Sequence, residues 1–309
     1  MSQDAYPESL VREPKVWRNL SQAQLDWAYD QANHAPNRIE VLESIAHKSA
    51  LSRAQVPKPL RLAYGHQASE QLDWYRCEID HAPVVFFVHG GAWKSGTAQD
   101  NALFVHWILA KGCHVVVPDF DPVTSVDGDL SHLAKQVQAA LFFTHQHCAV
   151  HRAHPQQIIV VGHSSGAHLS ACLATRDWRA MGLTSHPVAA LLCCSGMYEL
   201  EPVSLSARSQ YVQFNARVVE DLSPLRHLEA FQMPVSLLCG GLESPEFIRQ
   251  FEAFKEALLA KKHALQAHWV PGLNHFEMLE TLHDEQSIHA KALAALIDQV
   301  RIHQDASDL

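Results

Sequence analysis

The sequence has no run of about 18 apolar residues, the length that a membrane-spanning helix requires. Positive charge is also scarce, because 24 Lys and Arg residues stand against 33 Asp and Glu residues, giving a net charge of −9. Residues 1–15 contain no basic stretch followed by an apolar one, so no signal peptide is predicted. We therefore expect a cytoplasmic protein that binds neither membranes nor nucleic acid, whose phosphates require clustered Lys and Arg.

Patterns typical of disulfides and zinc sites are missing as well. The seven cysteines are odd in number, show no CxxC spacing and lie mostly in or beside apolar segments, which indicates buried reduced thiols. Histidine is abundant, with 22 residues, and four of these occur in HQHCAVHRAH at 145–154. That segment lacks zinc-site spacing, and histidines also complement the dipole at a helix end, so no metal is predicted.

What the sequence does contain is enough apolar residues, 47% of 309, for a sizeable core. The runs VVFFVH, VVVP, IIVVG, AALLCCS and VSLLCG are apolar throughout, which is typical of parallel strands buried on both faces. Strands are predicted at 59–64, 72–79, 84–89, 114–118, 158–162, 188–195, 235–240 and 266–270. Helices are predicted between them, at 101–111, 129–147, 166–175, 245–262 and 285–303. This alternation predicts a doubly wound, mostly parallel α/β sheet of eight strands.

Two further regions complete the predicted domain, which spans residues 1–309. Helices are expected at about 20–52, where Ser21 and Gln24 form a capping-box pattern, and a second helix covers 39–51. These helices carry no catalytic pattern. Residues 196–231 are polar and irregular, as a small cap or lid inserted after a central strand would be.

The stretch GHSSG places Ser164 at the centre of a G-x-S-x-G pattern. An apolar strand enters it and a small-residue helix leaves it, as a nucleophile elbow requires. Gly162 and Gly166 permit the sharp turn, and the N–H of Ser165 would point at a developing oxyanion. The alternative is a Gly-bounded structural turn that contains serine by chance.

Upstream, the strand VVFFVH ends in His89, Gly90, Gly91, Ala92 and Trp93. An HGG loop after an early strand supplies oxyanion-hole N–H groups in many esterases, because glycine lets the backbone approach the reacting carbonyl. We assign the N–H groups of Gly91 and Ala92 as donors, with His89 and Gly90 shaping the loop. Trp93 adjoins this loop and is a candidate for the pocket wall. A plain Gly-Gly turn is the alternative interpretation.

An acid and a base should follow later strands, in the order Ser, Asp/Glu, His. After VSLLCGG comes LESPEF, which offers Glu243 and Glu246. Pro245 is predicted to open a helix that contains Glu246, so Glu243 is the predicted acid. After AHWVP, His275 is predicted in a loop just before a helix and is the candidate base.

Two other histidines flank the nucleophile. His163 precedes Ser164 and is expected to point away from the nucleophile's face. His168 follows one helical turn later and is expected to pack inside the helix layer. Both are interpreted as structural histidines.

The segments HGGAW, GHSSGAHLSA, GGLESPEFIRQ and GLNHFEMLETL, with the N-terminal LDWAYDQA, resemble the arylformamidase (kynurenine formamidase) branch of the α/β-hydrolases. HGG and GxSxG are shared across esterases and lipases, whereas SGAHL, SPEF with RQ, and NHF are more specific. The acid before SPEF is usually aspartate in this family, and here it is Glu243.

The resemblance implies an α/β-hydrolase fold and hydrolysis of an aryl formamide, with N-formylkynurenine of tryptophan catabolism as the namesake substrate. Ser164, Glu243 and His275 would form the triad, and no cofactor would be needed. A small molecule is the expected partner, and the oligomeric state is open between monomer and homodimer. The alternatives are a short-acyl carboxylesterase of broad specificity and a non-catalytic ligand-binding homologue.

Overall fold

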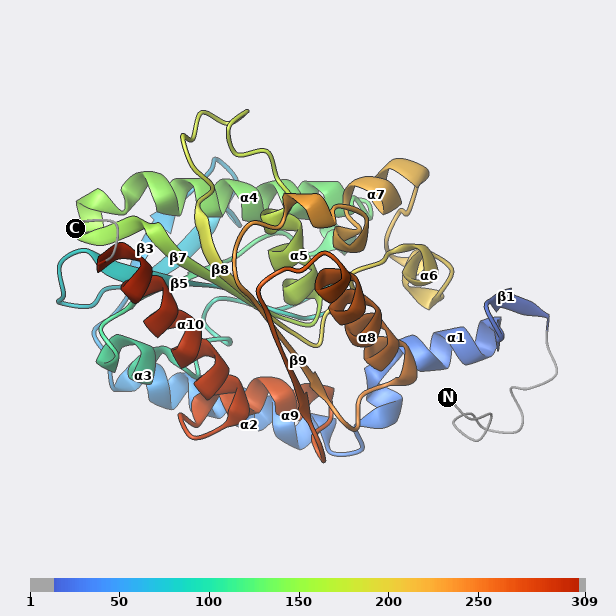
Figure 1. Ribbon diagram of the computed structural model, residues 1–309. Coiled ribbons are helices and arrows are strands. Elements are labelled where there is room, and N and C mark those ends of the chain that lie inside the picture. Colours follow the sequence, from blue (N-terminus) through green and yellow to red (C-terminus); the bar gives the residue numbers. More distant parts are fainter. Residues whose placement is uncertain (1–13, 306–309) are drawn as a thin grey trace.

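The computed structural model describes residues 14–305 and contains one eight-stranded sheet with helices on both faces (Figure 1). The strand order is β10-β9-β8-β7-β5-β6-β4-β3; β3 and β4 pair antiparallel with their neighbours, and the other pairs are parallel. The strands are β3 (Leu60–Ala63), β4 (Gln71–Tyr75), β5 (Ala82–Val88), β6 (His114–Pro118), β7 (Ala153–His163), β8 (Val188–Cys194), β9 (Val235–Gly240) and β10 (Leu265–Val270). The predicted sheet is thus confirmed, although β4 ends earlier and β7 begins earlier than expected.

Strand alternation divides the core into two layers. Val84, Phe86 and Val88 of β5 pack on one side of the sheet, whereas Val85 and Phe87 pack on the other. The first side is covered by α1 (Gln22–Tyr29), α4 (Leu130–His147), α5 (Ser165–Ala174) and α8 (Pro245–Ala260). The second side is covered by α2 (Arg38–Ala54), α3 (Val105–Ala110), α9 (His275–Glu280) and α10 (Ile288–Asp305). Burial on both faces explains why the central strands are apolar throughout.

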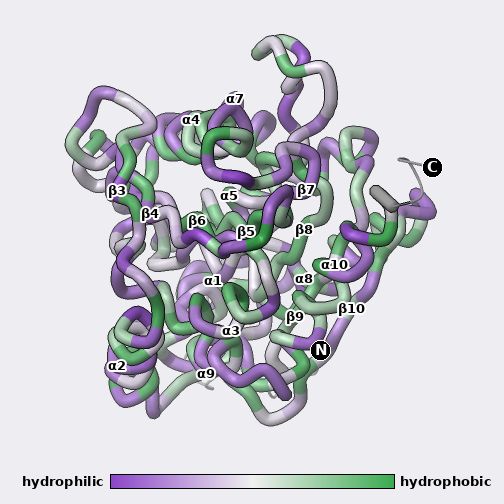
Figure 2. The backbone as a smooth tube through the Cα atoms, turned by 90° about the vertical axis from the view of Figure 1, so that its left-hand side faces the viewer, coloured by the Kyte–Doolittle hydropathy of each residue, from purple (hydrophilic) through white to green (hydrophobic). Residues whose placement is uncertain are grey.

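The N-terminal helices form as expected. Ser21 caps α1: its Oγ accepts from the Gln24 N–H at 3.3 Å, and the Gln24 side chain accepts from the Ser21 N–H at 2.9 Å. The tube of α2 alternates between hydrophilic and hydrophobic residues (Figure 2), and its buried positions Val41, Ile45 and Ser49 follow helical spacing. A short hairpin that was not predicted precedes α1, formed by β1 (Lys15–Trp17) and β2 (Leu20–Ser21).

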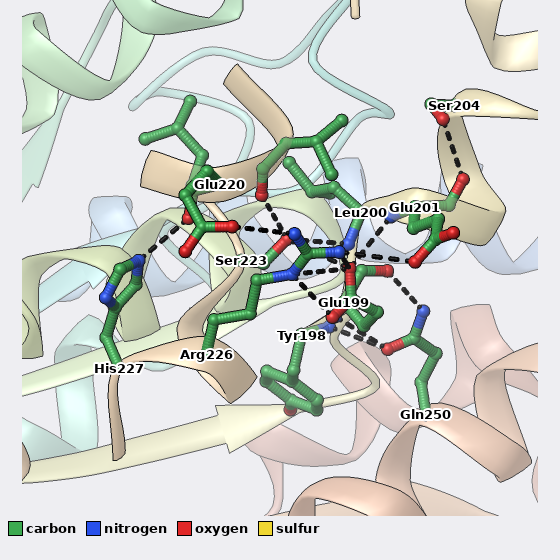
Figure 3. Close-up of polar contacts among 12 residues, drawn as sticks. Tyr198, Glu199, Leu200, Glu201, Ser204, Glu220, Ser223, Arg226, His227 and Gln250 are labelled. Atoms are coloured by element: carbon green, nitrogen blue, oxygen red, sulfur yellow. Dashed lines mark hydrogen bonds and ion pairs between the residues drawn. The ribbon is translucent and has the colours of Figure 1, made fainter. Parts of the chain in front are cut away.

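Residues 196–231, predicted as a cap and called the cap segment below, lie between β8 and β9. They form α6 (Glu201–Ser204), η6 (Ala207–Gln210), α7 (Ala216–Asp221), η7 (Pro224–Arg226) and η8 (Leu228–Ala230). Arg226 ties this segment together because its guanidinium pairs with the carboxylates of Glu199, Glu201 and Glu220 (Figure 3). Gln250 of α8 accepts from the Tyr198 and Glu199 N–H groups at 2.9 and 3.0 Å, which fixes the cap segment to the core.

The remaining one-turn helices are η3 (Gln31–His34), η4 (Val123–Ser125), η5 (Ala149–His151) and η9 (Thr281–His283). None of the helices between residues 14 and 305 is both long and apolar enough to cross a bilayer.

Candidate active site

Ser164 lies in the turn between β7 and α5, in a backbone conformation that a side chain rarely adopts (φ 58°, ψ −125°). Two hydrogen bonds hold it there: its N–H donates to the Cys194 carbonyl at 2.9 Å, and its carbonyl accepts from the His168 N–H at 3.2 Å. Backbone strain of this kind persists only where the surroundings fix it. The turn therefore presents the Ser164 hydroxyl at the N-terminus of α5, as a nucleophile elbow does.

Close packing explains the two glycines that flank this turn. A Cβ at Gly162 would lie 2.4 Å from the Ser170 Oγ, and a Cβ at Gly166 would lie 2.1 Å from the Val88 carbonyl oxygen. Both distances are far below van der Waals contact. Glycine at these positions therefore lets α5 approach β5 and β7.

The structure brings the three predicted triad residues into one hydrogen-bonded series. Ser164 Oγ lies 2.8 Å from His275 Nε2, and His275 Nδ1 lies 2.9 Å from Glu243 Oε2. All three side chains are buried. His275 was predicted in a loop, but it is the first residue of α9, because Asn274 caps this short helix by accepting from two backbone N–H groups.

The carboxylate of Glu243 has partners that sequence reasoning missed. Its Oε1 accepts from the Ser195 hydroxyl at 2.5 Å and from the Gly240 N–H at 2.8 Å. Its Oε2, besides facing His275, accepts from the Gln31 Nε2 at 3.3 Å. Ser195 directly follows β8, so its position at the carboxyl end of a parallel strand could have indicated that it lies in the site. Gln31 is distant from Glu243 in the sequence, and no sequence pattern indicated that the two are in contact.

Glu246, the alternative acid, has a structural role instead. Pro245 is the first residue of α8, as predicted, and Glu246 lies in the first turn of that helix. Its carboxylate binds the Arg249 guanidinium through both oxygens at 2.7–2.9 Å and accepts from the Tyr29 hydroxyl at 3.1 Å. The pKa of Tyr29 is raised by burial and by the neighbouring Glu246. Glu246 therefore anchors α8 to α1 and does not reach His275.

The HGG loop, the candidate oxyanion hole, lies beside Ser164. Gly91 and Ala92 both have positive φ, of 113° and 54°, and a Cβ at Gly91 would lie 2.1 Å from the Ser95 carbonyl oxygen. Within residues 14–305, the N–H groups of Gly91, Ala92 and Ser165 donate to no other protein group. Such N–H groups are available for a developing negative charge.

Two predictions about this loop need correction. Ser165 was given a role through its backbone only, but its Oγ accepts from the Trp93 N–H at 3.2 Å, so the hydroxyl holds the loop against α5. Trp93 was a candidate for the pocket wall, but its ring is 1% exposed and lies edge-on to His168 at 5.2 Å, behind the loop. Trp93 also has a positive φ of 61°, and its side chain belongs to the hydrophobic core.

His163 differs from its expected orientation. It was expected to point away from the Ser164 face, but it lines the same cavity and its Nε2 donates to the His275 carbonyl at 2.9 Å. Strand alternation explains this, because His163 shares a face with Val161, and α9 and α10 cover that face. Burial and the adjacent His275 lower the pKa of His163 well below its usual value, so the ring is neutral.

His168 packs inside the helix layer, as expected, and His89 lies beside the HGG loop. His168 is fully buried, and its Nε2 donates to the Leu222 carbonyl at 2.8 Å. His89 stacks on Phe120 at 4.3 Å, and its Nδ1 lies 2.9 Å from the Gly90 carbonyl oxygen, which shapes the HGG loop. Burial lowers the pKa of both rings.

A cavity of about 610 Å³ opens over Ser164 and His275. Leu42 and Ile45 of α2 and Phe276 of α9 supply apolar walls, and Arg38, Lys94 and Arg208 line it as cations. The N-terminal helices, in which the sequence shows no catalytic pattern, therefore form one side of the site. In the part of the chain that the structure describes, no three His, Cys, Asp or Glu residues come together as metal ligands.

The sequence profile of the BD-FAE family matches residues 72–240, more than half of the chain, and spans the strands from β4, except its first residue, to β9. The chain belongs to the BD-FAE family. This family membership, together with the sheet order, confirms the predicted α/β-hydrolase fold.

The chain is also similar to known hydrolases. Kynurenine formamidase of Danio rerio is 25% identical over 91% of this chain and 98% of its own length. Esterase LipC of Mycobacterium tuberculosis is 26% identical over 75% of this chain and 63% of its own length. The crystal structure of esterase B from Lactobacillus rhamnosis has a TM-score of 0.68 at 16% identity, covering 90% of this chain and 99% of that one. The protein is a hydrolase of the α/β family and is similar to kynurenine formamidase.

Proposed function

We propose that the protein hydrolyses an aryl formamide, such as N-formylkynurenine, to formate and the aryl amine. The observation that carries this proposal is the hydrogen-bonded series of Ser164, His275 and Glu243, which faces a cavity beside N–H groups without protein acceptors. The likeness to a kynurenine formamidase along nearly its whole length supports a formamide as the substrate.

In the first half of the reaction, His275 Nε2 takes the proton of Ser164 as Oγ bonds to the formyl carbon. The carbonyl oxygen becomes an oxyanion and accepts from the N–H groups of Gly91, Ala92 and Ser165, each of which contributes about 10²–10³-fold in rate. Glu243 holds the Nδ1–H of His275 and stabilises the imidazolium that forms.

In the second half, the C–N bond breaks and His275 gives its proton to the leaving amine, which leaves a formyl ester on Ser164. Water then attacks this ester while His275 takes the water's proton, and formate departs as Ser164 regains its proton. An aniline leaves more readily than an alkyl amine, so this relay suits an aryl formamide.

A short-acyl carboxylesterase is the second candidate, because an ester would use the same atoms and an esterase is among the similar proteins. A ligand-binding protein without catalysis is less well supported, because such a protein has no need of the intact hydrogen-bonded series.

The test is a comparison of kcat/KM for aryl formamides, including N-formylkynurenine, and for p-nitrophenyl acetate and butyrate. Because nitrophenyl esters are chemically activated, each value should be divided by the uncatalysed rate constant. Formamidase function predicts the larger enhancement for the formamides, and a Ser164→Ala preparation shows the background from other hydrolases. Turnover of the esters without turnover of any formamide would establish the carboxylesterase instead.

A further inference from the structure

Arg208 stands at the wall between the cavity above Ser164 and a second cavity of about 590 Å³. The second cavity lies between α1, η6 of the cap segment and the HGG loop. Four residues line both cavities: Asp30, Ala92, Lys94 and Arg208. The two spaces thus meet beside the loop that holds the predicted oxyanion donors.

The guanidinium of Arg208 is fixed in place. Its Nη1 donates to the Tyr211 hydroxyl at 2.9 Å, and its Nη2 donates to the Tyr29 carbonyl at 3.0 Å. Its Cζ lies 5.8 Å from the ring centre of Trp93 and 6.0 Å from that of Phe247. The Phe247 ring is in turn 4.9 Å from the His275 ring. Arg208 is therefore one aromatic ring away from the predicted base.

The guanidinium of Arg208 has hydrogen-bond acceptors but, among residues 14–305, no carboxylate as an ion-pair partner. Arginine has five N–H donors, and Arg208 uses two, which leaves three; its Nε has no acceptor among the described residues. Within residues 14–305, no carboxylate forms an ion pair with Arg208 or with Lys94, whose ammonium lies 4.3 Å from the ring centre of Tyr211. By contrast, Arg226 of the same cap segment is paired with three carboxylates.

A half-buried cation that lacks a counter-ion is costly unless an anion joins it. The cations Arg38, Lys94 and Arg208 line the cavity above Ser164 together with the carboxylates of Asp30 and Asp100. This lining therefore carries one more positive than negative charge in a protein whose net charge is −9, which favours an anion there. The planar guanidinium also matches the two oxygens of a carboxylate, which a lysine ammonium does not.

We propose that Arg208 binds a carboxylate carried by the leaving amine of the substrate. This inference rests on the proposed function, because a formyl group bears no substituent and the anion of a formamide substrate must therefore lie in its amine part. N-formylkynurenine carries such a carboxylate on its side chain, so the inference adds the residue that would bind it, Arg208, and the preference for anionic aryl formamides that follows. Lys94, at the rim, adds long-range attraction for the same anion.

The experiment compares 3-(3-formamidophenyl)propanoate with its neutral isostere, 3-(3-formamidophenyl)propanamide. For the wild type we expect kcat/KM to favour the anion by about 10- to 100-fold, mainly through KM, as a hydrogen-bonded charge pair provides. Arg208→Gln should bring the ratio of the two values close to one, and Arg208→Lys should retain part of it. Arg217→Gln is the matched control, because Arg217 is an exposed cap arginine paired with Asp221, and its ratio should equal that of the wild type.

An equal loss for both substrates in Arg208→Gln would mean that Arg208 only holds the cap segment to α1, and would overturn the inference. A wild type that hydrolyses both formamides without preference would overturn it too, while the proposed function stands. A binding measurement separates the two proposals if no formamide is hydrolysed. Calorimetry of 3-(3-aminophenyl)propanoate with Ser164→Ala should show binding that Ser164→Ala/Arg208→Gln lacks, and equal binding to both would contradict the anion site.

Discussion

Ser164 and Ser165 are neighbours in the chain, yet their hydroxyls have different tasks. Ser164 Oγ faces His275 Nε2 at 2.8 Å, whereas Ser165 Oγ accepts from the Trp93 N–H at 3.2 Å. The first hydroxyl is placed to react, and the second fixes the loop that would hold the oxyanion. The two positions therefore differ in how much activity depends on them.

Ser164→Ala is expected to lower kcat for any substrate by about 10⁴-fold or more, because no other group can form the acyl-enzyme. Ser165→Ala keeps the backbone N–H but leaves the buried Trp93 N–H without its acceptor, which costs roughly 1–3 kcal/mol. We expect a loss of about tenfold in kcat, with unchanged secondary structure by circular dichroism. Equal losses in the two variants would reverse the assignment of the nucleophile.

Glu243 and Glu246 can be separated in the same way. In Glu243→Gln the amide can donate to His275 Nδ1, which forces the proton onto Nε2 and removes the base, so kcat should fall by about 10³–10⁴-fold. In Glu246→Gln the largely buried Arg249 loses its charged partner, so the free energy of unfolding should fall by about 3 kcal/mol. Steady-state kinetics and urea unfolding of both variants measure this. Loss of kcat in folded Glu246→Gln comparable to that in Glu243→Gln would contradict the assignment.

The N-terminal elements α1 and η3 contribute to the site although they precede the sheet in the chain. Gln31 of η3 donates to Glu243 Oε2 at 3.3 Å and accepts from the Ser244 N–H at 3.2 Å. It thereby holds the loop that carries the acid.

Gln31→Leu removes both hydrogen bonds while keeping a similar volume. We expect kcat to fall by about tenfold, because the carboxylate of Glu243 loses one of the donors that orient it. Asn33→Ala is the matched control: Asn33 is an exposed residue of the same one-turn helix whose side chain donates to Asp30 at 3.3 Å. If Asn33→Ala loses as much activity as Gln31→Leu, the effect belongs to the stability of η3 and not to Glu243.

The sequence predicted the sheet well for a physical reason. Strands buried on both faces must be apolar throughout. An apolar run such as the one at 158–162 therefore predicts both a strand and the parallel strands that pair with it on either side. Residues at the carboxyl ends of these strands, Ser164 and Glu243, were found by the same rule. Gln31 was not found, because its role depends on a contact with Glu243 that only the folded chain creates. The orientation of His163 was not predicted, because it depends on the packing of α9 against the face of β7 on which His163 lies.

Buried neutral histidines distinguish the core of this protein. Burial lowers the pKa of His114, His168 and His289 to about 4 in each case. An unfolded chain binds protons at these rings from about pH 6.5 downward, while the folded protein does not until about pH 4. The unfolded state therefore takes up more protons in this window, and stability falls as the pH is lowered through it.

We expect the melting temperature to be nearly constant from pH 7 to pH 8 and to fall steadily between pH 6.5 and pH 4. His168→Gln keeps an N–H donor but cannot titrate. The loss of unfolding free energy between pH 7 and pH 4 should therefore be smaller in this variant than in the wild type, by on the order of 3 kcal/mol, and the fall in melting temperature should be shallower. Thermal unfolding across this range tests the prediction. A melting temperature that rises on acidification, or an unchanged slope in His168→Gln, would contradict it.

The covalent role of Ser164 is tested most directly by labelling the folded protein with a fluorophosphonate, followed by intact mass measurement and peptide mapping. We predict a single adduct on Ser164, complete loss of hydrolysis in parallel with labelling, and no adduct on Ser164→Ala. Hydrolysis that persists in fully labelled protein, or an adduct on another residue that accounts for the loss, would contradict a Ser164 acyl-enzyme.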